Sequence, residues 1–485
     1  MATGASRHSS LESIRVTQGW LEKLCGRFGK CPTPPQAYGI AVELGPLAAW
    51  WLRDEVLQAA VARFRELFPH TDPRKTGWTF PPRIPQECGS CWLLLANRDS
   101  KRLSLLRPCF AFPVRWVQGA GEHHPHLPRN LIDLAESVLA TIERQEKVGP
   151  LHTWKLAPGA GDLLEKHDLS QLDWSFESAW APLAAGLLMA TWGTNPKKDV
   201  WATGGYKAAD GGMVAVDHLA EKAEAAWRLG ARVLFVPRGQ RDDAQKAVSD
   251  RRLSDPATGQ ALQIGELGKD SSRPSQTLKE YLAQLELPPD REAPKGVRAG
   301  YFMRVPDFNQ AQDYYRRFIL PDVLKDNLPL MEPVQGNSLV TLVSKSLPLV
   351  ELAIGLVRPA SCLLLHNKEL AEEARKLSDT IRSEDYPCKF RLMTRQFDGE
   401  DYQALLEEFK GLIAEFLGEA SSGDLVADLT AGQRVMNLAL YDAVPPGSYI
   451  VCCQAEQHQG RPKPFTERIS IWQKGVRGNK DNKGH

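Results

Sequence analysis

Short apolar segments alternate with amphipathic segments over the last third of the chain, and this pattern constrains the fold more than any other feature. We expect strands at 339–343, 362–366, 390–393, 425–429 and 448–453, and helices at 349–357, 369–381, 402–416 and 435–443. Buried strands separated by helices favour a parallel, doubly wound sheet. The sequence therefore predicts an α/β domain at residues 333–474, and a disordered tail at 475–485 that is rich in Gly, Lys and Asn.

Two loops of this predicted domain carry groups that suit an anionic ligand. The first strand leads into Ser344, Lys345 and Ser346, and the fourth leads into the run 430–434, which ends at Arg434. In an open α/β sheet, ligands bind at the carboxyl ends of the strands, where helix N-termini attract phosphate. Either loop alone is better explained as an ordinary strand–turn–helix connection, but both are expected at one edge of the same sheet.

The run Asp428-Leu-Thr-Ala-Gly-Gln-Arg-Val-Met-Asn-Leu-Ala-Leu440 resembles the strand–loop–helix signature of CRISPR-associated Rossmann-fold (CARF) domains. Ala431 and Gln433 stand where that family often has Gly and Thr. The resemblance implies a cyclic oligoadenylate ligand made by a type III CRISPR complex, with cyclic tetra-adenylate favoured, and a homodimer formed through this domain. The implied ligand-binding residues are Ser344, Lys345, Ser346, Thr430, Ala431, Gly432, Gln433 and Arg434.

The middle of the chain holds a serine and a lysine that could form a catalytic pair. Ser178 precedes a helix of small apolar residues, and Lys222 follows Leu219 by three positions in the expected helix 219–229. Serine is a poor nucleophile unless a base takes its proton, and a lysine can do so when a dry pocket lowers its pKa. A capping serine and a solvated lysine are the alternative interpretation of the same two residues.

The order of motifs in this segment resembles the proteolytic domain of Lon. The matching residues are Ser178, Thr194-Asn-Pro196, Thr203-Gly204, Lys222, Ala225-Ala226, Gly230 and Pro237. The resemblance implies an α+β protease domain at residues 131–287, in which Ser178 is the nucleophile, Lys222 the general base and Thr203 a residue that orients the lysine. Trp180 replaces a glycine of the Lon pattern, and Asp217-His218 replaces a Gly-Gly pair.

Composition limits the remaining possibilities. The 485 residues carry 60 Lys and Arg against 59 Asp and Glu, so we expect no direct DNA binding. Without an apolar run of membrane-spanning length or a signal-peptide core, we expect a cytoplasmic protein. Nine cysteines, including the Cys88/Cys91 pair, suggest neither a disulfide framework nor a metal site, and we expect no metal and no cofactor. No phosphate-binding loop is present, so cleavage would be independent of ATP.

Together these features predict a sensor domain joined to an effector protease. Residues 1–130 stay unassigned, and 288–332 are expected to form a linker and a connecting helix. The expected substrate is a specific protein encoded nearby, such as a toxin, an antitoxin or a regulator. Two alternatives are a non-catalytic adaptor with a Lon-like fold and a CARF ring nuclease that degrades its own ligand.

Overall fold

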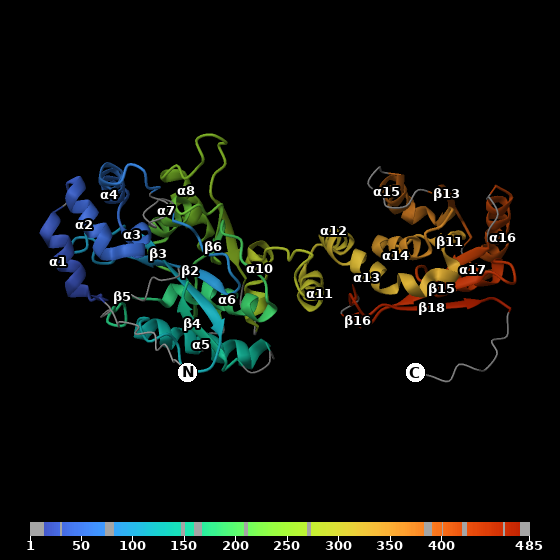
Figure 1. Ribbon diagram of the computed structural model, residues 1–485, viewed down its shortest axis with the longest axis horizontal. Helices are drawn as coiled ribbons and strands as arrows, with labels where there is room; N and C mark the ends of the chain where they lie inside the picture. The colour runs from blue at the N-terminus through green and yellow to red at the C-terminus, as the bar shows by residue number, and fades with distance from the viewer. Residues whose placement is uncertain are drawn as a thin grey trace, which may run out of the picture. The chain divides into compact units, whose positions relative to one another are not determined.

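The computed structural model describes residues 14–29, 32–72, 82–146, 151–159, 167–207, 212–268, 273–382, 390–399, 401–419, 424–458 and 461–475. The chain forms two compact units, an N-terminal unit (Met1–Pro288) and a C-terminal unit (Pro289–His485) (Figure 1). Of the tail expected at 475–485, residues 476–485 lie outside the described part. No helix in the described residues is long and apolar enough to cross a membrane.

The N-terminal unit begins with helices that pack beside an antiparallel sheet. These elements are β1 (Ile14–Arg15), α1 (Gln18–Phe28), α2 (Pro34–Leu44), α3 (Ala48–Trp51), α4 (Asp54–Leu67), β2 (Ser90–Ala96), β3 (Cys109–Gln118), α5 (Arg129–Glu146) and β4 (Trp154–Pro158). The strand order is β2-β3-β4. Every residue from Ser90 to Leu95 is buried, which requires cover on both faces of the strand. Helices α6 and α7 of the following segment both pack on β2 and β3.

The boundary expected between residues 130 and 131 therefore falls inside one unit. Strand β4 lies beyond that boundary and pairs with β3, which lies before it. One continuous hydrophobic core runs from Val16 to Leu285. The N-terminal region, which the sequence left unassigned, thus supplies a sheet that buries the helices of the predicted protease segment.

The rest of the N-terminal unit contains the segment that resembles Lon. Its elements are β5 (His167–Asp168), α6 (Trp180–Trp192), β6 (Val200–Ala202), β7 (Gly205–Lys207), β8 (Gly212–Val214), α7 (Leu219–Arg228), β9 (Val233–Pro237), α8 (Arg241–Asp250), β10 (Gln263–Leu267), α9 (Pro274–Thr277) and α10 (Lys279–Leu285). Strands β10, β9 and β6 form a parallel sheet, and β7 and β8 form an antiparallel hairpin. Helix α6 is buried at every position from Trp180 to Ala190, because it has no polar face.

Residues 288–332 are more ordered than the expected linker with a single helix. They form α11 (Lys295–Arg304), α12 (Phe308–Phe318) and α13 (Leu320–Asn327), followed by a 3-10 segment. Within the linker and connecting helix expected at 288–332, the first helix already begins at Lys295. The prolines and charges suggested a loop, but Pro294 caps α11, and Phe302 of this helix packs in the core of the C-terminal unit.

The C-terminal unit is built on a six-stranded sheet. Its elements are β11 (Ser338–Leu342), α14 (Leu347–Val357), β12 (Ser361–His366), α15 (Ala371–Arg382), β13 (Arg391–Gln396), α16 (Tyr402–Glu419), β14 (Leu425–Asp428), α17 (Arg434–Ala443), β15 (Tyr449–Gln454), β16 (Gln457–His458), β17 (Arg461–Pro462) and β18 (Arg468–Gln473). The strand order is β13-β12-β11-β14-β15-β18, and all neighbours are parallel except β18, which runs antiparallel to β15.

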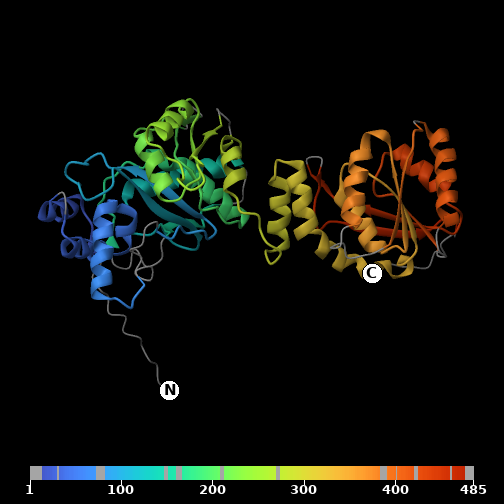
Figure 2. The same cartoon turned by 90° about the horizontal axis from the view of Figure 1, so that it is seen from above.

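Helices cover both faces of this sheet (Figure 2). Leu339 of β11 joins the core that contains α14 and α15, whereas its neighbour Val340 joins the core that contains α16 and α17. Successive side chains of a strand point to opposite faces, so β11 is buried on both. The predicted α/β class is confirmed. Strand β18 was not expected, because no helix separates it from β15.

Candidate active site and candidate anion site

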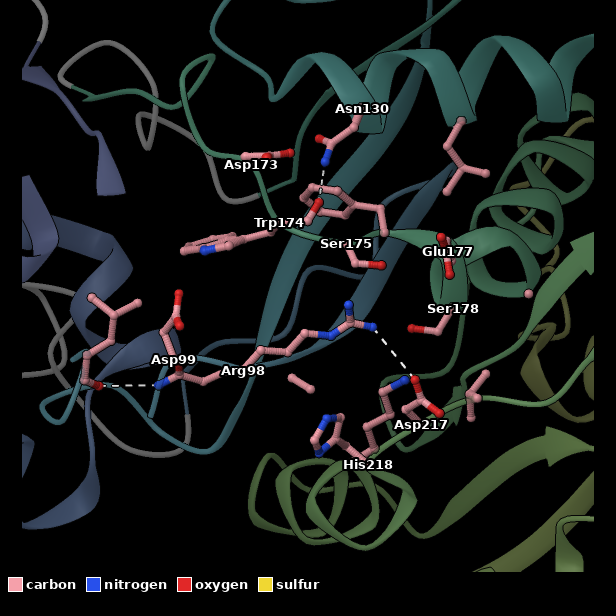
Figure 3. Close-up of a pocket in the computed structure, with 18 of the residues that line it drawn as sticks. Arg98, Asp99, Asn130, Asp173, Trp174, Ser175, Glu177, Ser178, Asp217 and His218 are labelled. Carbon is pink, nitrogen blue, oxygen red and sulfur yellow. Dashed lines mark hydrogen bonds and ion pairs between the residues drawn. The ribbon is translucent and has the colours of Figure 1, made fainter. Parts of the chain in front are cut away.

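A cavity of about 970 Å³ opens in the N-terminal unit. Three segments enclose most of it: the end of β2 with the loop after it, the segment leading into α6, and the segment leading into α7 (Figure 3). Both Ser178 and Lys222 line this cavity. The structure therefore brings together two residues that are 44 positions apart in the sequence.

Lys222 is buried at the wall of the cavity, with 3% of its surface exposed. Burial lowers its pKa from 10.5 to about 8, because the charged ammonium loses hydration. The nearby Cys109 and Asp217 partly raise this pKa again, and Arg98 lowers it further. Among the described residues, the ammonium group has no hydrogen bond or ion pair. Near pH 8 about half of the Lys222 side chains are therefore neutral amines that can accept a proton.

Ser178 lies on a 3-10 turn, Glu177–Ala179, directly before α6. Its carbonyl oxygen accepts a hydrogen bond from the Gly204 N–H at 2.8 Å. Strand β7 passes very close to this turn, because a Cβ added at its first residue, Gly205, would lie 2.9 Å from the Glu177 carbonyl oxygen. These contacts fix the serine backbone, while the half-buried side chain faces the cavity.

Thr203 is the residue that the Lon resemblance expects to orient the lysine. It is 1% exposed, and its hydroxyl donates to the Ser178 carbonyl oxygen at 3.4 Å. Among the described residues its side chain has no hydrogen bond to Lys222. Thr203 therefore holds the serine turn in this structure. No hydrogen bond joins Ser178 Oγ to Lys222 Nζ in the described residues either, and such bonds often form only when substrate is bound.

The two departures from the Lon pattern have different structural consequences. Trp180 is buried and stacks on Tyr206, with ring centroids 4.3 Å apart, and it does not line the cavity. His218 lines the cavity and has a left-handed φ of 56°, a backbone conformation that glycine adopts without strain. The neighbouring Asp217 also lines the cavity and forms an ion pair with Arg98.

Arg98 was not expected at this site from the sequence. It follows β2 in the region 1–130, and no recognisable motif surrounds it. Only the packing of β2 against α6 and α7 carries it to the cavity. No sequence signal local to Arg98 could have indicated this position.

The two loops expected to bind an anion lie together in the C-terminal unit. Strands β11 and β14 are parallel neighbours, with Thr341 beside Asp428, so both loops leave the same edge of the sheet. The side chains of Lys345, Gln433 and Arg434 are exposed there. Gln433 is the N-cap of α17, so the positive end of that helix dipole faces the same edge.

Other expected ligand residues shape these loops. The Thr430 Oγ1 accepts a hydrogen bond from the Cys453 N–H at 2.8 Å, and Ala431 is 4% exposed. The hydroxyl of Ser344 donates to the Ser346 carbonyl oxygen at 3.3 Å. Gly432 has a φ of 95°, and an added Cβ would lie 2.6 Å from Leu342 Cδ1. Four of the eight expected residues, Lys345, Gly432, Gln433 and Arg434, are thus exposed at the sheet edge.

Asp428 holds the second loop from beneath. Its carboxylate is fully buried and accepts hydrogen bonds from the Thr341 hydroxyl at 2.7 Å and from the Thr430 N–H at 2.9 Å. Burial raises the pKa of Asp428, while these hydrogen bonds oppose the rise. The acidic residue of the CARF-like run therefore has a structural role, and it does not face the ligand edge.

The described residues contain no group of three or more His, Cys, Asp and Glu side chains that could hold a metal ion. Cys88 and Cys91 are free thiols, and burial raises the pKa of both.

No protein-family model and no curated protein matches the chain. Among solved structures, the chain is similar to Can2 from Sulfobacillus thermosulfidooxidans in complex with cyclic tetra-adenylate. That match has 15% sequence identity and a TM-score of 0.21, and it covers 27% of this chain and 37% of Can2. Because a match of this quality does not establish a shared fold, we infer the function of both sites from their own residues.

Proposed function

We propose that the chain is a serine endopeptidase of the Lon-like type, controlled by a cyclic oligoadenylate that binds a CARF-type C-terminal unit. Ser178 is the nucleophile and Lys222 the general base. The observation that carries the proposal is the cavity that Ser178 shares with a lysine that is 3% exposed and whose pKa burial lowers to about 8. Burial of this kind is how a lysine becomes a base near neutral pH.

In the proposed reaction, Lys222 carries the proton both in the acylation of Ser178 and in the hydrolysis of the acyl-serine. The neutral Lys222 amine accepts the Ser178 hydroxyl proton as the Oγ attacks the peptide carbonyl carbon. The resulting ammonium then protonates the leaving amine as the C–N bond breaks, which leaves an acyl-serine. A water molecule, deprotonated by Lys222, then attacks the ester carbonyl carbon. The Lys222 ammonium returns this proton to Ser178 Oγ as the acyl C–O bond breaks and the carboxylic acid product leaves. Backbone N–H groups at the start of α6 are the candidate donors to the oxyanion.

In the C-terminal unit, the proposed ligand is an adenylate ring whose phosphates face Lys345 and Arg434. The exposure of both cations at one sheet edge and the N-terminus of α17 support an anionic ligand there. As the CARF resemblance implies, the unit acts as a homodimer, the ligand is cyclic tetra-adenylate, and the pathway is type III CRISPR antiviral defence.

Helix α12 is a candidate route by which ligand binding is coupled to proteolysis, because it is hydrogen-bonded to the first ligand loop. Gln312 Nε2 donates to the Lys345 carbonyl oxygen at 2.8 Å. Four positions further along α12, the Arg316 guanidinium pairs with both oxygens of Glu351 on α14. A ligand that repositions the loop would therefore act directly on α12, provided that it binds the two loop positions unequally.

The test is cleavage of casein and of proteins encoded beside the gene, with and without cyclic tetra-adenylate. We expect Ser178→Ala and Lys222→Ala each to lower the cleavage rate at least about 100-fold, because either change removes one partner of a catalytic pair whose members act together. Nucleotide affinity should change less than about three-fold, since that site is in the other unit.

Ser175→Ala is the matched control, because Ser175 lines the same cavity three positions earlier. Its rate should stay within about two-fold of wild type. Undiminished cleavage by the Ser178→Ala variant would refute the assignment of Ser178 as the nucleophile. Nucleotide binding without any cleavage would favour the adaptor, and loss of the nucleotide itself would favour the ring nuclease.

A further inference from the structure

The cavity beside Ser178 has an excess of negative side chains. Asp99, Asp173, Glu177 and Asp217 line it, and Arg98 is the one arginine among the described lining residues. Lys222 also lines the cavity, but it must be neutral to act as a base. A cleft with this balance concentrates positively charged groups and repels acidic ones.

Arg98 and Asp217 meet inside this cavity from different parts of the chain. The Arg98 Nη2 lies 3.7 Å from the Asp217 Oδ2, and 61% and 82% of the two side chains are exposed. Figure 3 shows the Arg98 side chain extending into the site with its guanidinium directed at Asp217. An exposed ion pair of this kind changes an equilibrium constant by no more than about five-fold. A cation from elsewhere can therefore replace Arg98.

We propose that Asp217 determines the substrate specificity of this cavity by binding a lysine or arginine side chain next to the scissile bond. Arg98 occupies that position until the substrate cation displaces it. The inference rests on the proposed protease function and adds the substrate class: a protein segment with a basic residue at the cleavage site. It also gives the N-terminal region a role, since that region supplies Arg98.

Asp217 is a better candidate than the other three carboxylates. It already holds a cation, and it lies directly before the left-handed His218 and five positions before Lys222. Asp99 accepts a hydrogen bond from Gln18 Nε2 at 3.2 Å. Asp173 and Glu177 are exposed and hold no cation among the described residues, so they add to the negative field only.

Lys222 is the independent observation that separates this cavity from an ordinary acidic surface. Its side chain is buried against the cavity wall without a hydrogen-bond partner in the described residues. An ammonium left in this state is costly and is found where a reacting group is needed. The carboxylates therefore surround a reaction centre, where a bound side chain has a defined place.

The test measures binding to the full chain carrying Ser178→Ala, with cyclic tetra-adenylate present. The probes are two fluorescein-labelled octapeptides of alanine and serine that differ only at one central residue, lysine or norleucine. By fluorescence anisotropy, we expect the lysine peptide to bind at least about ten-fold more tightly. The bound peptide covers Asp217, and a charge-assisted hydrogen bond that is shielded from water contributes more than the exposed pair with Arg98.

Three further changes, each combined with Ser178→Ala, assign the effect to a residue. Asp217→Asn should reduce the preference for lysine to about two-fold or less. Arg98→Ala should tighten binding of the lysine peptide up to about five-fold and leave the norleucine peptide unchanged, because the competing cation is gone. Asp173→Asn, a carboxylate of the same cavity, should keep most of the preference. Thermal unfolding of each variant shows that it is folded.

Equal binding of the two peptides would overturn the proposal, and so would a preference that Asp217→Asn retains. An experiment on the chain with Ser178 intact distinguishes failure of the specificity proposal from failure of the protease assignment. If casein is cut in a Ser178-dependent way, mass spectrometry should place the cuts next to Lys or Arg. Ser178-dependent cuts without that preference overturn the specificity inference alone. Selective peptide binding without any Ser178-dependent cut would instead refute the protease and retain the basic-residue site.

Discussion

Replacing Lys222 with methionine should make the N-terminal unit more stable at neutral pH while it abolishes catalysis. Burial lowers the lysine pKa from 10.5 to about 8, so below pH 8 the folded chain holds an ammonium that burial disfavours. At about 1.4 kcal/mol per pH unit, that difference corresponds to about 3 kcal/mol of lost stability. Methionine has a similar length and no charge, so it fills the same space without this cost.

The stability gained by Lys222→Met should decrease as the pH rises. Between pH 8 and 10.5 the unfolded wild-type chain binds a proton at Lys222 that the folded chain does not bind. Unfolding then takes up protons, and wild-type stability rises with pH over this window. Lys222→Met has no such group. Its advantage should be about 3 kcal/mol at pH 7 and should disappear near pH 10.5.

Urea unfolding followed by tryptophan fluorescence measures this difference. Trp472 is the one tryptophan of the thirteen that lies outside the N-terminal unit, so the signal reports on the unit that contains Lys222. With a denaturant dependence of about 3 kcal/mol per molar urea, the midpoint should rise by about 1 M at pH 7. Lys279→Met, at an exposed lysine of α10, is the control and should change stability by less than about 0.5 kcal/mol.

Equal or lower stability of Lys222→Met at pH 7 would refute the argument that burial strains this lysine. A gain that stays constant from pH 7 to 10.5 would refute it as well, since a packing effect does not titrate. Either result would also remove the physical basis for Lys222 as a base near neutral pH.

Four other predictions concern catalysis and the C-terminal unit. The peptidase kcat/KM should rise with pH and level off above about pH 8, because the neutral lysine is the active form; a flat profile from pH 6 to 9 would contradict this. Lys345→Ala and Arg434→Glu should each weaken cyclic tetra-adenylate binding by about 1–3 kcal/mol in calorimetry, and unchanged affinity in both would mean that the ligand binds elsewhere. Gly432→Ala should lower the unfolding free energy by about 1–2 kcal/mol and weaken the same ligand, given its φ of 95°; a variant as stable as wild type would show that the loop can relax. Arg316→Met leaves the Glu351 carboxylate, 2% exposed, without its guanidinium and should destabilise the C-terminal unit by at least about 3 kcal/mol in calorimetric unfolding.

The sequence by itself determined the five parallel strands of the C-terminal sheet, their order along the chain and the helices between them, but not α11 or β18. Four of those strands are mostly buried runs, whereas β13 is largely exposed or half-buried. Each helix has its own apolar face, so local periodicity is sufficient to locate these elements. The same holds for the buried helix after Ser178, whose residues are almost all apolar. The candidate residues Ser178 and Lys222 came from the order of motifs, which is also a property of the linear chain.

Tertiary structure alone decided what surrounds those residues. The pairing of β3 with β4 joins the N-terminal region to the predicted protease segment. The packing of β2 against α6 and α7 places Arg98 beside Asp217, which is 119 positions later in the chain. The burial that lowers the pKa of Lys222 likewise depends on which strands cover α7. A helix or a strand is specified by neighbours a few residues away, whereas burial, charge and the shape of a cavity depend on segments that meet only after the chain has folded.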